Sequence, residues 1–323
     1  MISFIIPVYN GEEKIERCIF SILNQKSNIP YEIVVVDDGS KDNTSQIVQS
    51  ICDTYFNVHY IFQENGGVSS ARNNGLNHSQ GEYVVFVDTD DFIEDSFFDS
   101  IDLSEKEELY IYGYNYIDEN GRKNIIHLEN QIIDKKDGIV KLYNGRLFNP
   151  VWNKIYKKSK IKRFFQNDFV MGEDLLFNIH YFKNIDRIKI IDKPLYNYCV
   201  NNGSVTKNYK FKYIVDFIQI YYELKDFLSS IEHKDFSQIE VDLVDNIVGT
   251  IFMLVNGNVT YSHYKEEMKK IYQELPKELF VFKSNNRISN LIFLSLKHRF
   301  FFIIFMIIKF KFFVKKLYYR LFK

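Results

Sequence analysis

The amino-acid sequence predicts an α/β fold in which a doubly wound, mostly parallel sheet is followed by a helical C-terminal extension. Over roughly the first 100 residues, short β-branched apolar runs alternate with segments of helical spacing, as in βαβ units. These runs are continuously apolar, which is typical of strands buried on both faces. From about residue 208 onward, apolar residues recur only with helical spacing.

Four apolar runs are expected to form the parallel strands. They are Ile2–Val8, Ile33–Val36, Val58–Phe62 and Tyr83–Val87. Between the first two runs, apolar residues at i, i+3, i+4, i+7 and i+8 predict one face of a helix. These residues are Ile15, Cys18, Ile19, Ile22 and Leu23. Because ligands bind at the carboxyl ends of parallel strands, the polar residues after the four runs should border one crevice.

Later segments are mixed and then helical. Strand-like runs at Leu109–Ile117, Ile188–Ile191 and Leu195–Cys199 surround a helix that begins near Glu173. Apolar residues between positions 244 and 255 mark one face of a long helix: Val244, Ile247, Val248, Ile251, Phe252 and Val255. We therefore expect an α/β domain of residues 1–205, a helical extension of residues 206–286 and a basic tail of residues 287–323.

The composition narrows the class of protein. Hydrophobic residues make up 46% of the 323 residues and charged residues 26%, which excludes disordered, collagen-like and low-complexity proteins. Cys18, Cys52 and Cys199 have no paired spacing, which argues against a disulfide scaffold or a zinc site and fits a reducing compartment. The N-terminal apolar run has no preceding basic region and ends at Pro7, so we expect a strand there and no signal peptide.

The tail is strongly basic. Nine Lys or Arg and no Asp or Glu lie between Arg287 and Lys323, whereas the preceding residues carry 32 basic and 42 acidic side chains, a net charge of −10. Neither apolar run of the tail reaches the ~18–20 residues of a membrane-spanning helix. At about 100° per residue, every basic residue from Lys297 onward except Arg299 falls within one half-circle. This pattern predicts a basic amphipathic helix in an anionic membrane surface, with packing on the acidic body or on another subunit as the alternative.

Three carboxylates follow the fourth strand, in Asp88-Thr89-Asp90-Asp91. Carboxylates this close repel one another unless a divalent cation or a hydrogen-bond network balances them, so the segment could hold a cation that bridges to a diphosphate. The alternative is that one Asp caps the next turn while the others are solvated.

Two other strand ends carry groups suited to a nucleotide. Asp37 and Asp38 follow the second strand, and a carboxylate there can accept a hydrogen bond from a base or a ribose hydroxyl, while Tyr9 could stack on the base. After the third strand, Gly66 and Gly67 precede a helix with Arg72, a combination suited to phosphate but also to a plain helix start. No Gly-x-Gly-x-x-Gly or P-loop pattern is present.

Together, the segments resemble the family 2 glycosyltransferases with the GT-A fold, over about residues 1–200 and most strongly over about residues 1–95. The segments are Pro7-Val8-Tyr9-Asn10, Asp37-Asp38-Gly39-Ser40, Asn65-Gly66-Gly67 with Ala71-Arg72-Asn73, Gly81-Glu82-Tyr83, Asp88-Thr89-Asp90-Asp91, Val151-Trp152-Asn153-Lys154 and Gly172-Glu173-Asp174. The resemblance implies a nucleotide-diphospho-sugar-binding sheet and an inverting enzyme that moves a sugar from a nucleoside diphosphate to a hydroxyl.

The resemblance also assigns roles to residues. It implies that Asp174, beside Glu173, is the catalytic base and that Asp90 or Asp91 binds Mn²⁺ or Mg²⁺, with Asp90 preferred. The implied donor-binding residues are Pro7, Tyr9, Asp38, Gly67, Arg72, Asp88 and Thr89, and the implied acceptor-side residues are Trp152, Asn153 and Lys154. Taken alone, the acidic pair would be ordinary helix capping and Trp152 would be a core residue.

The expected substrates follow from the same resemblance. We expect a UDP-hexose or UDP-N-acetylhexosamine donor and, as acceptor, a growing surface glycan of a capsule, cell wall or glycoprotein, free or lipid-linked. The Gln-x-x-Arg-Trp element of processive synthases is absent, which favours transfer of a single sugar. The expected location is the cytoplasmic face of the membrane; nucleic acid is not an expected partner, and a homo-oligomer is left open.

Two other functions compete with this interpretation. One is a catalytically inactive scaffold that binds glycan or nucleotide sugar, which would be expected to lack some of the acidic residues that are present here. The other is a sugar nucleotidyltransferase, which would need a Gly-rich, basic loop directly after the first strand. Tyr9-Asn10-Gly11-Glu12 does not supply such a loop.

Overall fold

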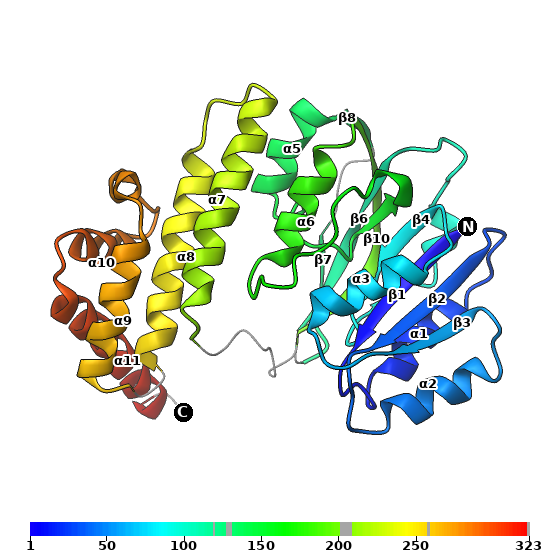
Figure 1. The fold of residues 1–323 in the computed structure, drawn as a ribbon, viewed down its shortest axis with the longest axis horizontal. Helices are drawn as coiled ribbons and strands as arrows, with labels where there is room; N and C mark the ends of the chain where they lie inside the picture. Colours follow the sequence, from blue (N-terminus) through cyan, green and yellow to red (C-terminus); the bar gives the residue numbers. More distant parts are fainter. Residues whose placement is uncertain (119, 127–130, 201–208, 257–258, 322–323) are drawn as a thin grey trace. The chain divides into compact units, whose positions relative to one another are not determined.

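We describe a computed structural model of the chain, which covers residues 1–118, 120–126, 131–200, 209–256 and 259–321 (Figure 1). The chain divides into two compact units. The first consists of Met1–Phe169 with Glu173–Asn202, and the second of Val170–Gly172 with Gly203–Lys323. The second unit thus contains both of the segments expected separately, 206–286 and 287–323.

The first unit is built on a sheet with the strand order β3-β2-β1-β4-β9-β6-β10-β5. Its first four strands are parallel, as predicted, and lie side by side in Figure 1. They are β1 (Ile2–Val8), β2 (Tyr31–Asp37), β3 (Val58–Phe62) and β4 (Tyr83–Phe86). All seven residues of β1 are buried, in agreement with a strand covered on both faces.

The other half of the sheet is mixed. Strand β9 (Lys154–Lys157) runs antiparallel to both β4 and β6 (Leu109–Ile117), whereas β6 and β10 (Arg187–Cys199) are parallel. The short edge strands β5 (Phe92–Ile93), β7 (Lys123–Ile126) and β8 (Gln131–Asp134) pair antiparallel. The two runs predicted after residue 187 form one strand, β10, whose register shifts around Pro194 because a proline cannot donate to the ladder.

Helices cover both faces of this sheet. They are α1 (Ile15–Leu23), α2 (Thr44–Cys52), α3 (Val68–His78), α4 (Phe97–Ser100), α5 (Lys135–Asn144), the 3₁₀ turn η1 (Lys158–Lys160) and α6 (Glu173–Phe182). The apolar face predicted for α1 is buried in the main core, beside Phe4 and Ile6 of β1. Helix α3 approaches β1 closely at Gly75, where a Cβ atom would lie 2.4 Å from Cγ2 of Ile5.

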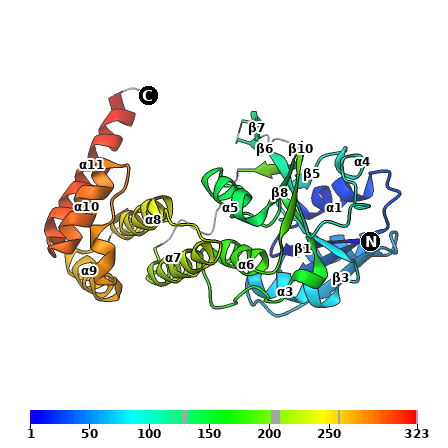
Figure 2. The same ribbon diagram turned by 90° about the horizontal axis from the view of Figure 1, so that it is seen from above.

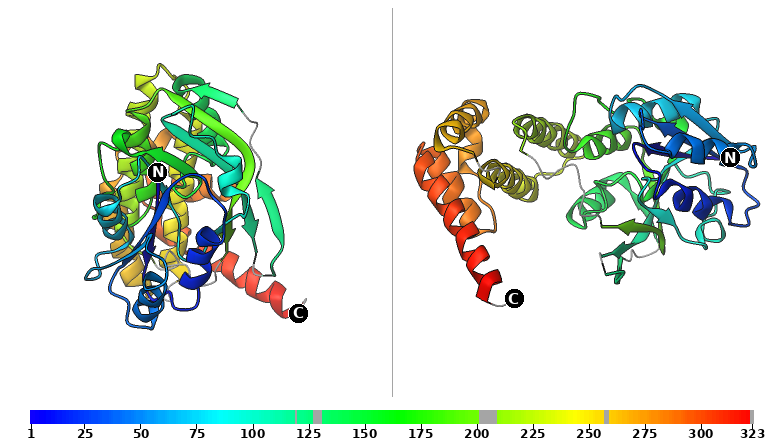
Figure 3. Two further views of the ribbon diagram at one scale, coloured as in Figure 1. Left: turned by 90° about the vertical axis from the view of Figure 1, so that its right-hand side faces the viewer. Right: turned by 90° about the horizontal axis from the view of Figure 1, so that it is seen from below.

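The second unit is helical. It contains α7 (Lys212–Ser230), α8 (Ser237–Asn256), α9 (Tyr261–Glu274), the 3₁₀ turn η3 (Lys277–Val281), α10 (Arg287–Lys297) and α11 (Phe301–Leu321). The face predicted from residue 244 to residue 255 is largely buried in α8. Helices α10 and α11 pack on each other and both contact α8 (Figure 2, Figure 3).

The prediction of one continuous helix in the tail is wrong. Helix α10 ends at Lys297, and Arg299 adopts a left-handed conformation with φ of 57°. The Phe300 N–H donates to the carbonyl of Ser295 and the Arg299 N–H to that of Leu296, at 2.8 and 3.0 Å. This is the Schellman arrangement that ends a helix, here formed without glycine. The angular positions calculated from Lys297 therefore do not carry over into α11.

No helix in the described part of the chain is both long and apolar enough to cross a bilayer.

Candidate active site

Three strand ends meet in the first unit. The N–H of Asp38, just after β2, donates to the carbonyl of Val8 at 2.8 Å, and the hydroxyl of Thr89, just after β4, donates to the carbonyl of Pro7 at 2.5 Å. The acidic segments after β2 and β4 therefore flank the end of β1, as the parallel topology predicts.

A buried arginine joins three distant segments at this edge. Arg72 of α3 has a side chain only 4% exposed, and its Nη1 lies 2.7 Å from Oδ1 of Asp174 at the start of α6. Its Nη2 lies 2.9 Å from Oδ1 of Asp88, and Oε1 of Glu173 is 3.8 Å from Nη1. The guanidinium carbon also lies 5.3 Å from the ring centroid of Phe165. One fixed cation thus holds the predicted base next to the acidic segment after β4.

The surroundings of Asp174 suit a general base. Burial raises the pKa of its carboxyl from 3.8 to about 7 against the lowering effect of Arg72, and the Glu173 and Asp88 carboxylates add to the rise. The side chain is still 25% exposed, so a substrate hydroxyl could approach it. A base with a pKa near neutrality can both accept and release a proton under physiological conditions.

The carboxylates of the segment from Asp88 to Asp91 occupy different environments. Asp91 is fully buried: its Oδ2 accepts from the Tyr196 hydroxyl and its Oδ1 from the Cys199 N–H, both at 2.8 Å. Burial, followed by the Asp88 carboxylate, raises the pKa of Asp91 well above its usual range. Asp90 is half-buried, and its carbonyl accepts from Arg17 at 2.7 Å. Asp91 is therefore a structural carboxylate in this conformation.

The described residues include no group of three or more His, Cys, Asp or Glu side chains placed to hold a metal ion. In substrate complexes, Mg²⁺ is commonly held by one or two carboxylates together with phosphate oxygens. The half-buried carboxylates Asp88 and Asp90, beside the buried Asp91, fit that kind of site and do not fit an all-protein cage.

The predicted donor-binding residues differ in accessibility. The Asp38 carboxylate is buried and accepts from the N–H groups of Gly66 and Gly67, both at 2.8 Å, and from Gln63 at 2.7 Å. Asp38 therefore fixes the loop that leads into α3, because the backbone N–H groups of Gly66 and Gly67 in this loop point to its carboxylate. Tyr9, in contrast, is 51% exposed at the end of β1, which leaves its ring accessible for stacking.

The predicted acceptor-side element is an internal support. Lys154 and Asn153 are fully buried, and the Lys154 ammonium donates to Asn153 Oδ1 at 2.8 Å and to the carbonyls of Leu147 and Pro150. Burial lowers the pKa of Lys154 well below its usual value. Neither side chain reaches the surface in this structure, and Trp152 is buried as well, so this element shapes the preceding loop and its role on the acceptor side stays a prediction.

Sequence reasoning missed Arg17 and Tyr196. The Tyr196 hydroxyl accepts from the N–H of Asp88 at 3.1 Å and donates to Asp91, which lies 105 positions away in the sequence. Only the placement of β10 in the sheet brings these residues together. The alternation of Tyr196 and Tyr198 along a strand was the one available signal, because it places both rings on one face.

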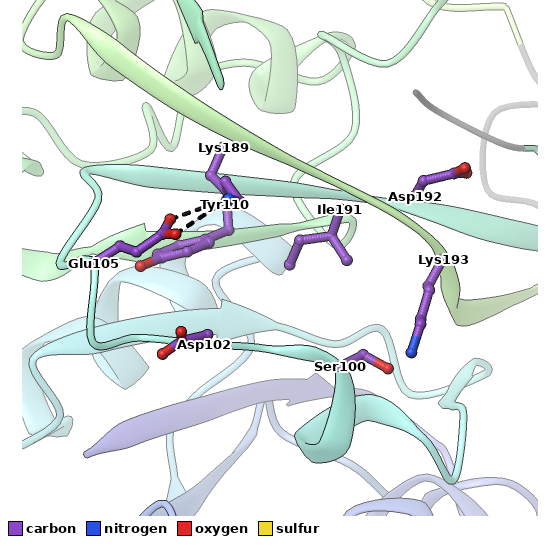
Figure 4. A pocket seen from close by; sticks show the side chains of 8 residues that line it. All are labelled: Ser100, Asp102, Glu105, Tyr110, Lys189, Ile191, Asp192 and Lys193. Carbon is purple, nitrogen blue, oxygen red and sulfur yellow. Dashed lines mark hydrogen bonds and ion pairs between the residues drawn. The ribbon is translucent and has the colours of Figure 1, made fainter. Parts of the chain in front are cut away.

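A cavity of about 170 Å³ lies elsewhere in the first unit, as Figure 4 shows. It is lined by residues of β6, β10 and the segment before β6, and the Lys189 ammonium lies 3.1 Å from a Glu105 carboxylate oxygen at its wall. Because Tyr110 of β6 and Ile191 of β10 line it, the cavity lies along these two strands and away from their carboxyl ends. None of the predicted site residues lines it.

The chain resembles known proteins in sequence. The sequence model of Glycosyl transferase family 2 matches residues 3–165. The chain is 32% identical over 218 residues to EpsJ of Bacillus subtilis, an uncharacterized glycosyltransferase, covering 64% of this chain and 63% of EpsJ. It is 30% identical over 220 residues to the glycosyltransferase GlyA of Streptococcus pneumoniae, covering 64% of this chain and 31% of GlyA. These matches thus span less than two thirds of either relative.

The fold also has a solved counterpart. TarS of S. aureus, residues 1–349 in complex with UDP-GlcNAc, superposes with a TM-score of 0.67 at 21% identity, over 95% of this chain and 90% of that one. This similarity confirms the expected GT-A fold. With the family match over half of the sequence and the acidic segments gathered at the strand ends, it leads to one conclusion: the chain belongs to glycosyltransferase family 2.

Proposed function

We propose that the protein is an inverting glycosyltransferase that transfers one sugar from a UDP-hexose or UDP-N-acetylhexosamine to a hydroxyl of a growing surface glycan. The observation that carries this proposal is the Asp174 carboxyl, which has a pKa of about 7 and is held by Arg72 beside Asp88 at the strand ends. The family match supports the reaction class, and the crystallised complexes of TarS with UDP and UDP-GlcNAc support the choice of donor.

The proposed reaction is a single displacement at the anomeric carbon. The oxygen of the acceptor hydroxyl forms a bond to the anomeric carbon on the face opposite the diphosphate. At the same time Asp174 accepts the proton of that hydroxyl. The bond between the anomeric carbon and the diphosphate oxygen breaks, and the UDP leaves with the electron pair. Because one attack occurs on one face, the configuration inverts and no covalent enzyme intermediate is needed.

The donor would be held at the ends of β1 and β4. We propose that Tyr9 stacks on the uracil, that the segment after β2 borders the nucleoside, and that Asp90 holds Mn²⁺ or Mg²⁺ jointly with the diphosphate. Such a cation would neutralise the charge that develops on the leaving diphosphate. Asp90 is preferred to Asp91 because Asp90 is half-buried, whereas Asp91 is fully buried and both of its oxygens accept hydrogen bonds inside the protein.

We also propose that the protein lies peripherally on the cytoplasmic face of the membrane, through α11. Exposed apolar side chains recur on this helix at Phe302, Ile303, Met306 and Phe310. The segment from 287 to 323 has nine basic and no acidic residues, so it would be attracted to anionic lipid. Lys309 and Lys311 contact Val255 and Phe252 of α8, so the exposed apolar residues supply the lipid-facing contact in this proposal.

Release of UDP from a panel of UDP-sugars, with and without Mn²⁺, tests the enzymatic proposal. We expect slow, metal-dependent hydrolysis of one donor by the wild type and a large loss in Asp174→Asn. Asp53→Asn, which makes the same change at an exposed position after α2, is the matched control and should behave as wild type. Failure to bind or hydrolyse any of the nucleotide sugars would contradict the proposal and favour a scaffold.

A further inference from the structure

A ladder of aromatic rings leads outward from the acidic segment. The Trp152 ring stacks on two tyrosines of β10, with ring centroids 4.6 Å from Tyr196 and 5.3 Å from Tyr198 and interplanar angles of 14°. Tyr198 in turn lies 5.9 Å from Tyr116 of β6 at 36°. Tyr114 of β6 meets Trp152 edge-on at 4.8 Å. The parallel pairing of β6 and β10 sets this order, because it places Tyr116 directly opposite Tyr198.

The two ends of the ladder differ in burial. At its inner end Tyr196 is buried and hydrogen-bonded to both Asp88 and Asp91, so its ring is fixed. At its outer end Tyr116 is 38% exposed and Tyr198 is half-buried. The outer rings therefore present an apolar surface to solvent, and Tyr198 stacks on the buried Trp152 ring. Rigid aromatic surfaces of this kind contribute contact area at a low entropic cost.

This surface lies beside the proposed reaction centre. Tyr116 and Tyr198 are near the carboxyl ends of β6 and β10, and Tyr196, two residues earlier on β10, touches the acidic segment directly. Burial, together with the nearby Asp91, Asp90 and Asp88 carboxylates, raises the pKa of Tyr198. In the sheet order, β6 and β10 lie on the opposite side of β4 from β1, and Tyr9 directly follows β1.

We propose that Tyr116 and Tyr198 form a platform on which a sugar ring of the acceptor glycan stacks. The inference rests on the proposed function and deepens it, because it names the acceptor subsite. A pyranose ring has an apolar face of C–H groups that can cover an aromatic ring, while its hydroxyls remain in water. The neighbouring carboxylates would repel a phosphate group, so a neutral sugar fits this position better than a second nucleotide.

The platform also explains the buried residues of the predicted acceptor-side element. Lys154 and Asn153 hold the segment that carries Trp152, and the Trp152 carbonyl accepts from the Tyr112 hydroxyl at 2.6 Å. Trp152 is thereby held in its stacked position on Tyr198. In this arrangement these residues are positioning residues that act on the acceptor through the tyrosine rings.

Binding of neutral saccharides tests the platform without a known acceptor. The probes are the methyl β-glycosides of glucose, galactose and N-acetylglucosamine and their β-linked disaccharides. Their binding is measured by saturation-transfer NMR and by the fluorescence emission of Trp152. Trp152 is the only tryptophan of the sequence, so a change in emission reports on this site. We expect saturable binding of at least one saccharide, with the strongest saturation on its axial C–H protons.

Substitutions of Tyr116 distinguish stacking from general surface binding. Tyr116→Ala should weaken the affinity for that saccharide about tenfold, Tyr116→Phe should retain it, and thermal melting should show that both variants are folded. Phe56→Ala, at a ring 94% exposed between α2 and β3, is the matched control and should not change the affinity.

Two results would overturn the platform: no saturable binding of any of these saccharides to the wild type, or equal affinity in Tyr116→Ala. Binding of UDP, measured separately by calorimetry, tests the proposed function instead. Saccharide binding that depends on Tyr116 without any nucleotide binding would support the platform and contradict the transferase, so the two failures are distinguishable.

Discussion

Nη1 of Arg72 lies 2.7 Å from Oδ1 of Asp174, although 102 positions separate the two residues in the sequence. The same guanidinium donates to Asp88 at 2.9 Å through its other terminal nitrogen. Burial raises the pKa of Asp174, and Arg72 limits that rise. The pKa of about 7 is thus a balance in which Arg72 acts as a positioning residue for the proposed base.

Arg72→Gln should shift the pH dependence of the reaction to higher pH. The substitution removes the positive charge nearest to Asp174, so the apparent pKa of the base should rise by about one unit or more. The measurement is kcat/KM for UDP-sugar hydrolysis as a function of pH. Arg122→Gln, at an exposed loop position, is the control, and an unshifted profile in Arg72→Gln would contradict the assigned role.

The wild-type protein should gain the proposed activity with rising pH up to neutrality. Only the deprotonated Asp174 can accept a proton, so kcat/KM should rise about tenfold per pH unit below pH ~7 and level off above it. Asp174→Asn should lower activity by about 10²–10⁴-fold and abolish this limb of the profile. A profile that is flat from about pH 5 to about pH 8 would exclude Asp174 as the titrating base.

The same carboxyl should destabilise the fold at high pH. Its pKa in the folded protein, about 7, lies above the ordinary value of 3.8, so the folded state binds more protons between these values and stability falls as pH rises through that range. Asp174→Asn lacks this effect. The Tm of the variant minus that of the wild type should therefore increase from about pH 4 to pH 7 and stay constant above. A difference that does not vary with pH would refute the prediction.

Local sequence patterns predicted the elements that depend on local physics. The continuous apolar run Ile2–Val8 and the helical spacing from Ile15 to Leu23 have the same limits in the structure, because both reflect burial in a single layered core. The prediction of one continuous helix in the tail was wrong for a local reason as well. Arg299 adopts a left-handed conformation that sequence patterns associate with glycine, so the helix end at Lys297 had no recognisable signal.

The contacts within the site were harder to predict from the sequence. The predicted parallel topology was enough to bring the strand ends together. The position of α6 decides the pairing of Arg72 with Asp174, and the position of β10 decides that of Tyr196 with Asp91. Equally, the burial of Lys154 has no sequence signal, since a lysine beside a tryptophan is ordinarily exposed. The contact of Arg72 with a phosphate stays a prediction, whereas its contacts with the Asp88 and Asp174 carboxylates had no sequence signal, because these partners are brought in from other segments.

Asp90 and Asp91 should differ when each is replaced by alanine. Asp90→Ala should remove the strengthening of UDP binding by Mn²⁺, because Asp90 is the proposed metal ligand. Asp91→Ala should retain that metal dependence but lower the free energy of unfolding by about 2 kcal/mol, since it leaves the Tyr196 hydroxyl and the Cys199 N–H without their acceptor. Calorimetric titration of UDP with and without Mn²⁺, together with thermal melting, separates the two roles. The reverse pattern would make Asp91 the ligand.

Replacing exposed apolar residues of α11 should release the protein from lipid. Phe302 and Phe310 are exposed on this helix, so the double substitution Phe302→Ser, Phe310→Ser removes apolar contact area without opening the core. Cosedimentation with vesicles containing anionic lipid should fall about tenfold or more, and wild-type binding should weaken with salt, because the tail has nine basic and no acidic residues. Phe56→Ser, at an exposed ring of the first unit, is the matched control. Unchanged sedimentation of the double variant, or equal binding of the wild type to vesicles of zwitterionic lipid alone, would exclude this surface as the membrane contact and favour an interface with another protein.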